Sequence, residues 1–137
     1  MKKDFKTLRI LVCDDEPLII MSISRFLKKI ALVKTVPTAE EALDAIEEQH
    51  YDLCFLDFTL PGMTGLDAMK IIAELSPNTK VAIMTGTLLN EAMKEQVDDY
   101  AYTFIEKPFI SLCRLSLWLR CHALALGQLG IKTGGLI

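Results

Sequence analysis

The feature that most constrains the fold of this chain is a fivefold alternation of short apolar runs with segments of helical periodicity. The apolar runs have the length and composition of buried strands and lie at residues 8–13, 33–36, 53–57, 80–84 and 102–105. The periodic segments predict helices at about 17–31, 66–75, 89–97 and 110–126, and a further helix that begins at Thr38. Strict alternation of strand and helix favours a parallel sheet with helices on both faces. With right-handed crossovers, the result is a three-layer, doubly wound α/β domain.

The composition is that of one foldable domain with no electrostatic signature of a nucleic-acid partner. The 137 residues are 51% hydrophobic and 24% charged, and the net charge is −3. That length can bury a substantial core. We therefore expect a single folded unit that does not bind nucleic acid, because no basic stripe offsets the negative balance.

The sequence offers neither a secretion signal nor a membrane span. The apolar run after the amino-terminal lysines ends at Cys13, shorter than the roughly 7–15 residues of a signal core. No run approaches the ~20 apolar residues of a membrane helix. The other cysteines are Cys54, Cys113 and Cys121, and no C-x-x-C pair occurs. We expect a cytoplasmic protein, without membrane contact, whose thiols are reduced.

Polar residues directly follow the apolar strands. Asp14 and Asp15 follow 8–13, Asp57 ends the run 53–57, Thr85 follows 80–84 and Lys107 comes shortly after 102–105. Parallel strands deliver their carboxyl ends to one edge of the sheet, where open α/β folds bind ligands. We therefore expect these side chains to converge on one site, although Asp57 taken alone is also explained as a turn former.

The expected cluster suggests phosphoryl chemistry. Carboxylates at Asp14, Asp15 and Asp57 repel one another, so they need a cation, and oxygen ligands suit Mg²⁺. A carboxylate beside Mg²⁺ and Lys107 can attack phosphorus and form an acyl phosphate, while the Thr85 hydroxyl can donate to a phosphoryl oxygen. The next acid, Glu16, is explained equally well as a further metal-site acid or as a helix cap.

From about residue 8 to 126 the chain resembles the receiver domain of two-component response regulators. The matching motifs are Asp14-Asp15-Glu16, Asp57 with the turn 60–65, Met84-Thr85-Gly86 and the segment 104–109. The resemblance implies the flavodoxin-like strand order 2-1-3-4-5. It also implies that Asp57 accepts the phosphoryl group.

The same resemblance implies roles for the surrounding residues. Asp15 would bind Mg²⁺ (or Mn²⁺) directly, Asp14 mainly through metal-bound water, and Thr59 through its backbone carbonyl. Thr85 would be the switch hydroxyl and Lys107 the phosphate partner. The switch aromatic would be Phe104.

Two residues depart from the family pattern. Phe104 has no hydroxyl, so its movement can be driven only by packing. Tyr100 stands before Ala101 where the family usually has Gly. This difference should change the shape of the end of the fourth helix, and with it part of the surface expected to contact a signalling partner.

We expect a phosphoacceptor that takes phosphate from a histidine kinase or a histidine phosphotransfer protein and signals by protein contact. It would catalyse only its own phosphotransfer and autodephosphorylation, so it would not be an enzyme in the usual sense. The predicted organisation is a receiver domain at 1–126 and a Gly-rich tail at 127–137, with no output domain. One alternative is a receiver module excised from a hybrid kinase or a multidomain regulator. Another is a phosphohydrolase with an Asp nucleophile, which is disfavoured because Thr59 replaces the second Asp of its Asp-x-Asp motif.

The last predicted helix has more apolar surface than one contact with a sheet requires. Residues 112, 115, 119, 122 and 126 form one stripe, and residues 110, 113, 117, 121 and 124 form a second. We expect the second stripe to support self-association, as a two-fold dimer through the fourth helix, fifth strand and last helix, or binding of another partner. The alternative is that the tail after Gly127 folds back over it.

Overall fold

Five parallel strands form one sheet in the order β2-β1-β3-β4-β5, as predicted. The structure is a computed structural model, and it describes residues 8–29, 31–86, 90–101 and 103–106. The strands are β1 (Leu8–Cys13), β2 (Ala31–Val36), β3 (Leu53–Asp57), β4 (Lys80–Thr85) and β5 (Thr103–Glu106).

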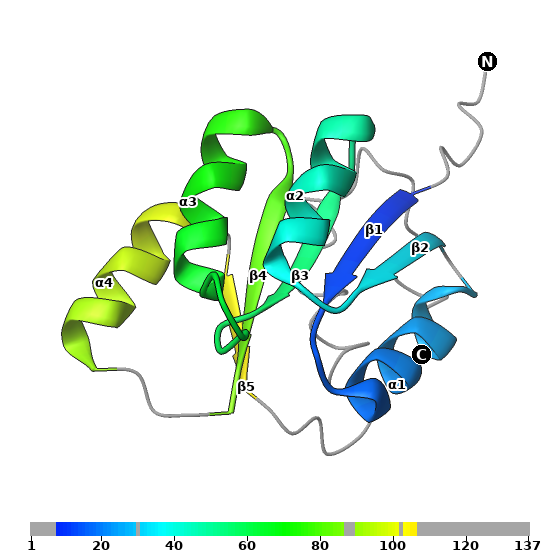
Figure 1. Cartoon of the computed structure of the whole chain (residues 1–137), viewed down its shortest axis with the longest axis horizontal. Coiled ribbons are helices and arrows are strands. Elements are labelled where there is room, and N and C mark those ends of the chain that lie inside the picture. The colour runs from blue at the N-terminus through cyan, green and yellow to red at the C-terminus, as the bar shows by residue number, and fades with distance from the viewer. Residues whose placement is uncertain (1–7, 30, 87–89, 102, 107–137) are drawn as a thin grey trace, which may run out of the picture.

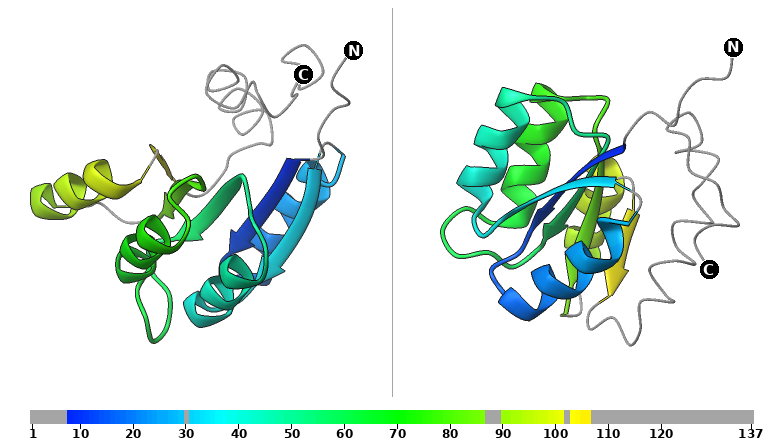
Figure 2. Two further views of the ribbon diagram at one scale, coloured as in Figure 1. Left: turned by 90° about the horizontal axis from the view of Figure 1, so that it is seen from above. Right: turned by 90° about the vertical axis from the view of Figure 1, so that its right-hand side faces the viewer.

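The described helices are α1 (Pro17–Leu27), α2 (Ala39–Glu48), α3 (Gly65–Leu75) and α4 (Glu91–Tyr100). Helices α2, α3 and α4 pack on one face of the sheet and α1 packs on the other (Figures 1 and 2). This gives the predicted three layers. The last predicted helix, at 110–126, lies outside the described residues, as does the tail.

Both faces of the sheet carry a hydrophobic core. One core lies under α2 and α3, where Met69 and Ile72 are fully buried, and the other lies under α1, where Ile23 and Leu27 are fully buried. All five residues of β3 are buried, so the prediction of a strand covered on both faces is confirmed. No helix among the described residues is long and apolar enough to span a membrane.

The boundary between α1 and β2 differs from the prediction. Periodicity extended the helix to about residue 31 and began the strand at 33, whereas α1 ends at Leu27 and β2 begins at Ala31. β2 pairs with β1 over six residues, from Leu8 opposite Ala31 to Cys13 opposite Val36. Pairing with β1 satisfies backbone groups that a longer helix would have used, so tertiary contact overrides the apolar pattern here.

Side-chain caps start the next three helices. Thr38 accepts a hydrogen bond of 3.2 Å from the Glu41 N–H, as the capping prediction required, and donates to the Glu41 carboxylate at 3.0 Å. Thr64 caps α3 through the Asp67 N–H. Asn90 caps α4, which runs to Tyr100 where periodicity predicted 89–97. Only Val97 of α4 is buried, so its weak apolar pattern could not locate the helix end.

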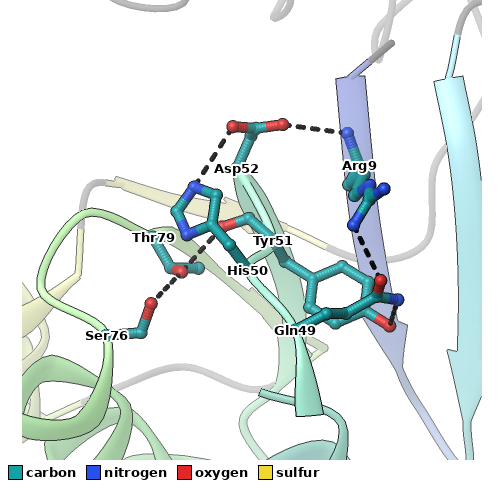
Figure 3. Close-up of polar contacts among 7 residues, drawn as sticks. All are labelled: Arg9, Gln49, His50, Tyr51, Asp52, Ser76 and Thr79. Atoms are coloured by element: carbon teal, nitrogen blue, oxygen red, sulfur yellow. Dashed lines mark hydrogen bonds and ion pairs between the residues drawn. The ribbon is translucent and has the colours of Figure 1, made fainter. Parts of the chain in front are cut away.

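A polar network aligns the amino ends of three strands (Figure 3). The buried Asp52 carboxylate accepts a hydrogen bond of 2.9 Å from the Arg9 N–H, and the Asp52 N–H donates to the Arg9 carbonyl at 2.8 Å. The buried Thr79 hydroxyl donates to the Tyr51 carbonyl at 2.7 Å. Arg9 also bonds Gln49, which in turn donates to the Tyr51 hydroxyl. These bonds join β1 to β3 and β3 to β4 at the end of the sheet opposite Asp57.

Candidate functional site

The carboxyl ends of β1, β3 and β4 place three polar side chains at one edge of the sheet. Asp14 directly follows β1, Asp57 ends β3 and Thr85 ends β4. All three are nearly fully buried, with exposed fractions of 0%, 4% and 3%. Asp57 pairs in register with Met84, the residue before Thr85, so the two strand ends lie side by side.

The turn after β3 fixes the position of Asp57. The Phe58 N–H donates to the Met84 carbonyl at 2.8 Å, which extends the sheet one residue past the strand. The Thr59 N–H donates to Oδ1 of Asp57 at 3.2 Å. The Gly65 N–H closes the turn by donating to the Phe58 carbonyl at 3.1 Å. Backbone bonds on both sides thus hold the Asp57 carboxylate at the end of a rigid strand.

Asp14 is held in the same way. Its N–H donates to the Val36 carbonyl at 3.2 Å, which ties it to the end of β2, and its Oδ1 accepts a hydrogen bond of 2.9 Å from the Glu16 N–H. Asp14, Glu16 and Asp57 each present a carboxylate oxygen within 4.8 Å of the other two. Three carboxylates at this separation repel one another, so the group is suited to hold a metal ion.

The cluster contains Glu16 where the resemblance pointed to Asp15. Glu16 is the N-cap residue of α1, but its side chain makes no capping hydrogen bond, so the capping explanation is wrong. Its backbone is extended, with φ −93° and ψ 112°. Alternate residues of an extended chain point to the same side, which brings Glu16 to the side of Asp14. Asp15 is exposed and lies outside the group, so its role as a direct ligand stays a prediction. The two-residue spacing was the signal that could have singled out Glu16.

Negative charge at this edge also acts on a neighbouring thiol. Burial, followed by the charges of Asp14 and Asp57, raises the pKa of Cys13 to about 12. The thiol is therefore neutral at physiological pH, and it donates to the Thr38 carbonyl at 3.3 Å. Burial also raises the pKa of Cys54, and both cysteines are free, as predicted. Cys113 and Cys121 lie outside the described residues.

The remaining predicted site residues are described in part or not at all. Thr59 is exposed next to Asp57. Phe104 lies in β5 opposite Ile83, and its backbone alone is described. Lys107 lies outside the described residues, so its part in the site stays a prediction.

Comparison with known proteins decides the family. The family model of the response regulator receiver domain matches residues 10–115. The chain belongs to this family. The receiver domain match also favours the phosphoacceptor interpretation over that of a phosphohydrolase.

Solved receiver structures resemble the chain over most of its length. A CheY-like receiver domain protein from Methanospirillum hungatei superposes with a TM-score of 0.80 at 26% identity, covering 90% of this chain and 99% of that one. The TrrA response regulator of Thermotoga maritima, in complex with Mg²⁺ and BeF, superposes with a TM-score of 0.72 at 27% identity, covering 84% and 98%.

The curated relatives include both short and long proteins. The chain is 28% identical to the chemotaxis protein CheY of Thermotoga maritima, over 74% of this chain and 86% of that one. It is 32% identical to the sensory/regulatory protein RpfC of Xanthomonas campestris, over 77% of this chain but 15% of that protein. The chain therefore spans less than half the length of most of these curated relatives and most of the length of the Thermotoga CheY. As a receiver domain, it has a phosphoacceptor role in two-component signalling.

Proposed function

We propose that Asp57 is the phosphoacceptor and that it takes a phosphoryl group from a phosphohistidine of a histidine kinase or a histidine phosphotransfer protein. The observation that carries the proposal is the position of its carboxylate. Asp57 ends a fully buried strand, is fixed by the turn after it, and shares its edge of the sheet with Asp14 and Glu16. A nucleophile held this rigidly is pre-positioned for in-line attack.

The transfer balances as a substitution at phosphorus. A carboxylate oxygen of Asp57 forms the new P–O bond while the P–N bond to the histidine ring breaks. The electron pair of that bond goes to the ring nitrogen. A ring already protonated on its other nitrogen leaves as neutral imidazole, and an unprotonated ring takes a proton from solvent. The product is an acyl phosphate on Asp57.

The donor set fits Mg²⁺ or Mn²⁺. Asp57 and Asp15 would supply carboxylate oxygens and Thr59 its backbone carbonyl, while Asp14, which lies in one carboxylate group with Asp57, would act mainly through metal-bound water. Such an ion takes few protein carboxylates, keeps several waters and accepts phosphoryl oxygens. When bound, it offsets the negative charge of the phosphoryl oxygens during transfer. A related receiver, TrrA, has been crystallised with Mg²⁺ and BeF, which supports this choice.

The conformational switch is proposed to act through residues at or near the ends of β4 and β5. The Thr85 hydroxyl donates to a phosphoryl oxygen on Asp57, Lys107 pairs with the same group, and Phe104 repacks in response. The result is a change in the surface that a protein partner contacts. The chain then catalyses only its own phosphotransfer and autodephosphorylation.

The context of the domain is also a proposal. A stand-alone receiver has a precedent in the Thermotoga CheY, of which the chain covers 86%, and a module of a longer protein has one in RpfC. We favour a receiver at 1–126 that signals by protein contact. Self-association through α4, β5 and the last helix remains part of this proposal.

A small phosphoramidate donor tests the proposal because its P–N bond matches that of phosphohistidine. The chain is incubated with phosphoramidate and Mg²⁺, and its intact mass is measured. We expect one phosphoryl adduct, lost when a chelator removes the ion. Asp57→Asn should lose the adduct, and its matched control Asp67→Asn, at an exposed carboxylate in the first turn of α3, should keep it. No adduct at saturating Mg²⁺, in a folded chain, would exclude the proposed function.

A further inference from the structure

Glu16 is the one exposed member of the carboxylate group at the edge of the sheet. Asp14 and Asp57 are buried, whereas the Glu16 side chain reaches the same point from the solvent side. An exposed acid normally turns away from two buried carboxylates, because like charges at this separation raise its free energy. Its place in the group therefore calls for a physical cause.

Backbone contacts contribute to that placement. The Glu16 N–H is held by Oδ1 of Asp14 at 2.9 Å, and the Glu16 carbonyl accepts hydrogen bonds from the N–H groups of Ile19 and Ile20, each at 3.1 Å. Pro17 at the first helical position fixes the direction in which α1 leaves. These contacts lock residue 16 in an extended conformation beside Asp14. The carboxylate does not cap the helix and presents an oxygen within 4.8 Å of carboxylate oxygens of Asp14 and Asp57.

We infer that Glu16 is a determinant of cation affinity at this site, supplying a further carboxylate beside Asp14 and Asp57, in addition to the proposed ligand Asp15. The inference rests on the proposed function, in which the site takes Mg²⁺ with the phosphoryl group. Mg²⁺ sites that rely on a substrate phosphate commonly use one or two carboxylates. With the additional carboxylate of Glu16, the protein holds its cation more tightly before any phosphoryl donor arrives.

Calorimetric titration of the unphosphorylated chain with Mg²⁺ tests this directly and does not depend on phosphoryl transfer. Loss of one negative charge from the group reduces the Coulomb attraction for a divalent ion, and in a mostly aqueous setting this would weaken binding roughly tenfold. We expect Glu16→Gln to raise the Kd for Mg²⁺ by about that factor. Glu48→Gln is the matched control, because it removes the same charge from the exposed last residue of α2, near the opposite end of the sheet. Its Kd should stay within twofold of wild type.

The outcomes separate this inference from the proposed function. A Glu16→Gln chain that is folded by circular dichroism and binds Mg²⁺ like wild type overturns the role of Glu16. Equal weakening in Glu16→Gln and Glu48→Gln also overturns it, because the effect would then come from net charge. Phosphorylation of wild type at saturating Mg²⁺ is measured alongside, and its failure would count against the proposed function instead.

Discussion

The backbone of Gly65 lies directly against that of Asp57. A Cβ at residue 65 would lie 2.8 Å from the Cα of Phe58 and closer still to the Asp57 carbonyl oxygen. Because these neighbours are backbone atoms, they cannot rotate away as a side chain would. The start of α3 can therefore approach the end of β3 only where residue 65 is glycine, and this approach helps to fix Asp57.

Gly65→Ala should disturb both stability and chemistry. Forcing a methyl group into this contact shifts the backbone at Asp57, and overpacking of this kind costs about 1–3 kcal/mol. We expect a lower free energy of unfolding in urea and slower phosphorylation by a small donor. Gly62→Ala is the control, since Gly62 has a positive φ of 78° and, among the described residues, an added Cβ would meet only Glu40 at 3.6 Å. It should lose about 1–2 kcal/mol from backbone strain but keep the phosphorylation rate. Equal rates in both variants would contradict the role given to Gly65.

The opposite end of the sheet should affect stability without affecting phosphorylation. Thr79→Val keeps the shape of the side chain but removes the hydroxyl that donates to the buried Tyr51 carbonyl (Figure 3). An unsatisfied buried acceptor costs about 1–3 kcal/mol. The free energy of unfolding measured in urea should fall by that amount. Phosphoryl uptake per folded molecule should stay as in wild type. A large loss of uptake would show that the two ends of the sheet are coupled.

The order of the elements and the positions of Asp14, Asp57 and Thr85 followed from the sequence, because each is read from a residue that directly follows an apolar run. The end of α4 did not follow from it, since Val97 is the only buried residue there and the apolar pattern is weak. The place of Glu16 was left open between a cap and a metal-site acid. Its position depends on the extended backbone at residue 16 and on the hydrogen bond to Asp14, which hydrophobic periodicity does not report.

Thr85 should be needed for signalling and not for phosphorylation. The hydroxyl is proposed to stabilise the phosphorylated conformation, so Thr85→Ala should still accept phosphate. The substitution should shift the equilibrium between the inactive and the active conformation toward the inactive one by about 1–3 kcal/mol, the usual size of a coupling energy. Amide chemical shifts of the phosphorylated chain would report this shift. Thr85→Ser keeps a hydroxyl and should behave like wild type, and a similar loss in both variants would rule out the hydrogen bond as the cause.

Tyr100, which the resemblance aligns with a position where glycine is usual, contacts α3 from α4. The Lys70 Nζ lies 5.8 Å from the centre of the Tyr100 ring. A cation–π contact at an exposed position contributes about 0.5–1 kcal/mol. A double-mutant cycle of Lys70→Met and Tyr100→Leu, followed by urea unfolding, should give a coupling energy of that size. Strictly additive effects would show that the two side chains do not interact.

The acceptor residue itself is the central claim, and mapping the acyl phosphate tests it most directly. The phosphorylated chain is treated with borohydride, which reduces an aspartyl phosphate to homoserine, and the peptides are sequenced by mass spectrometry. The account predicts homoserine at position 57 alone in wild type, and none in Asp57→Asn treated in the same way. Homoserine at another aspartate of wild type, or a phosphoryl adduct that persists in folded Asp57→Asn, would contradict it.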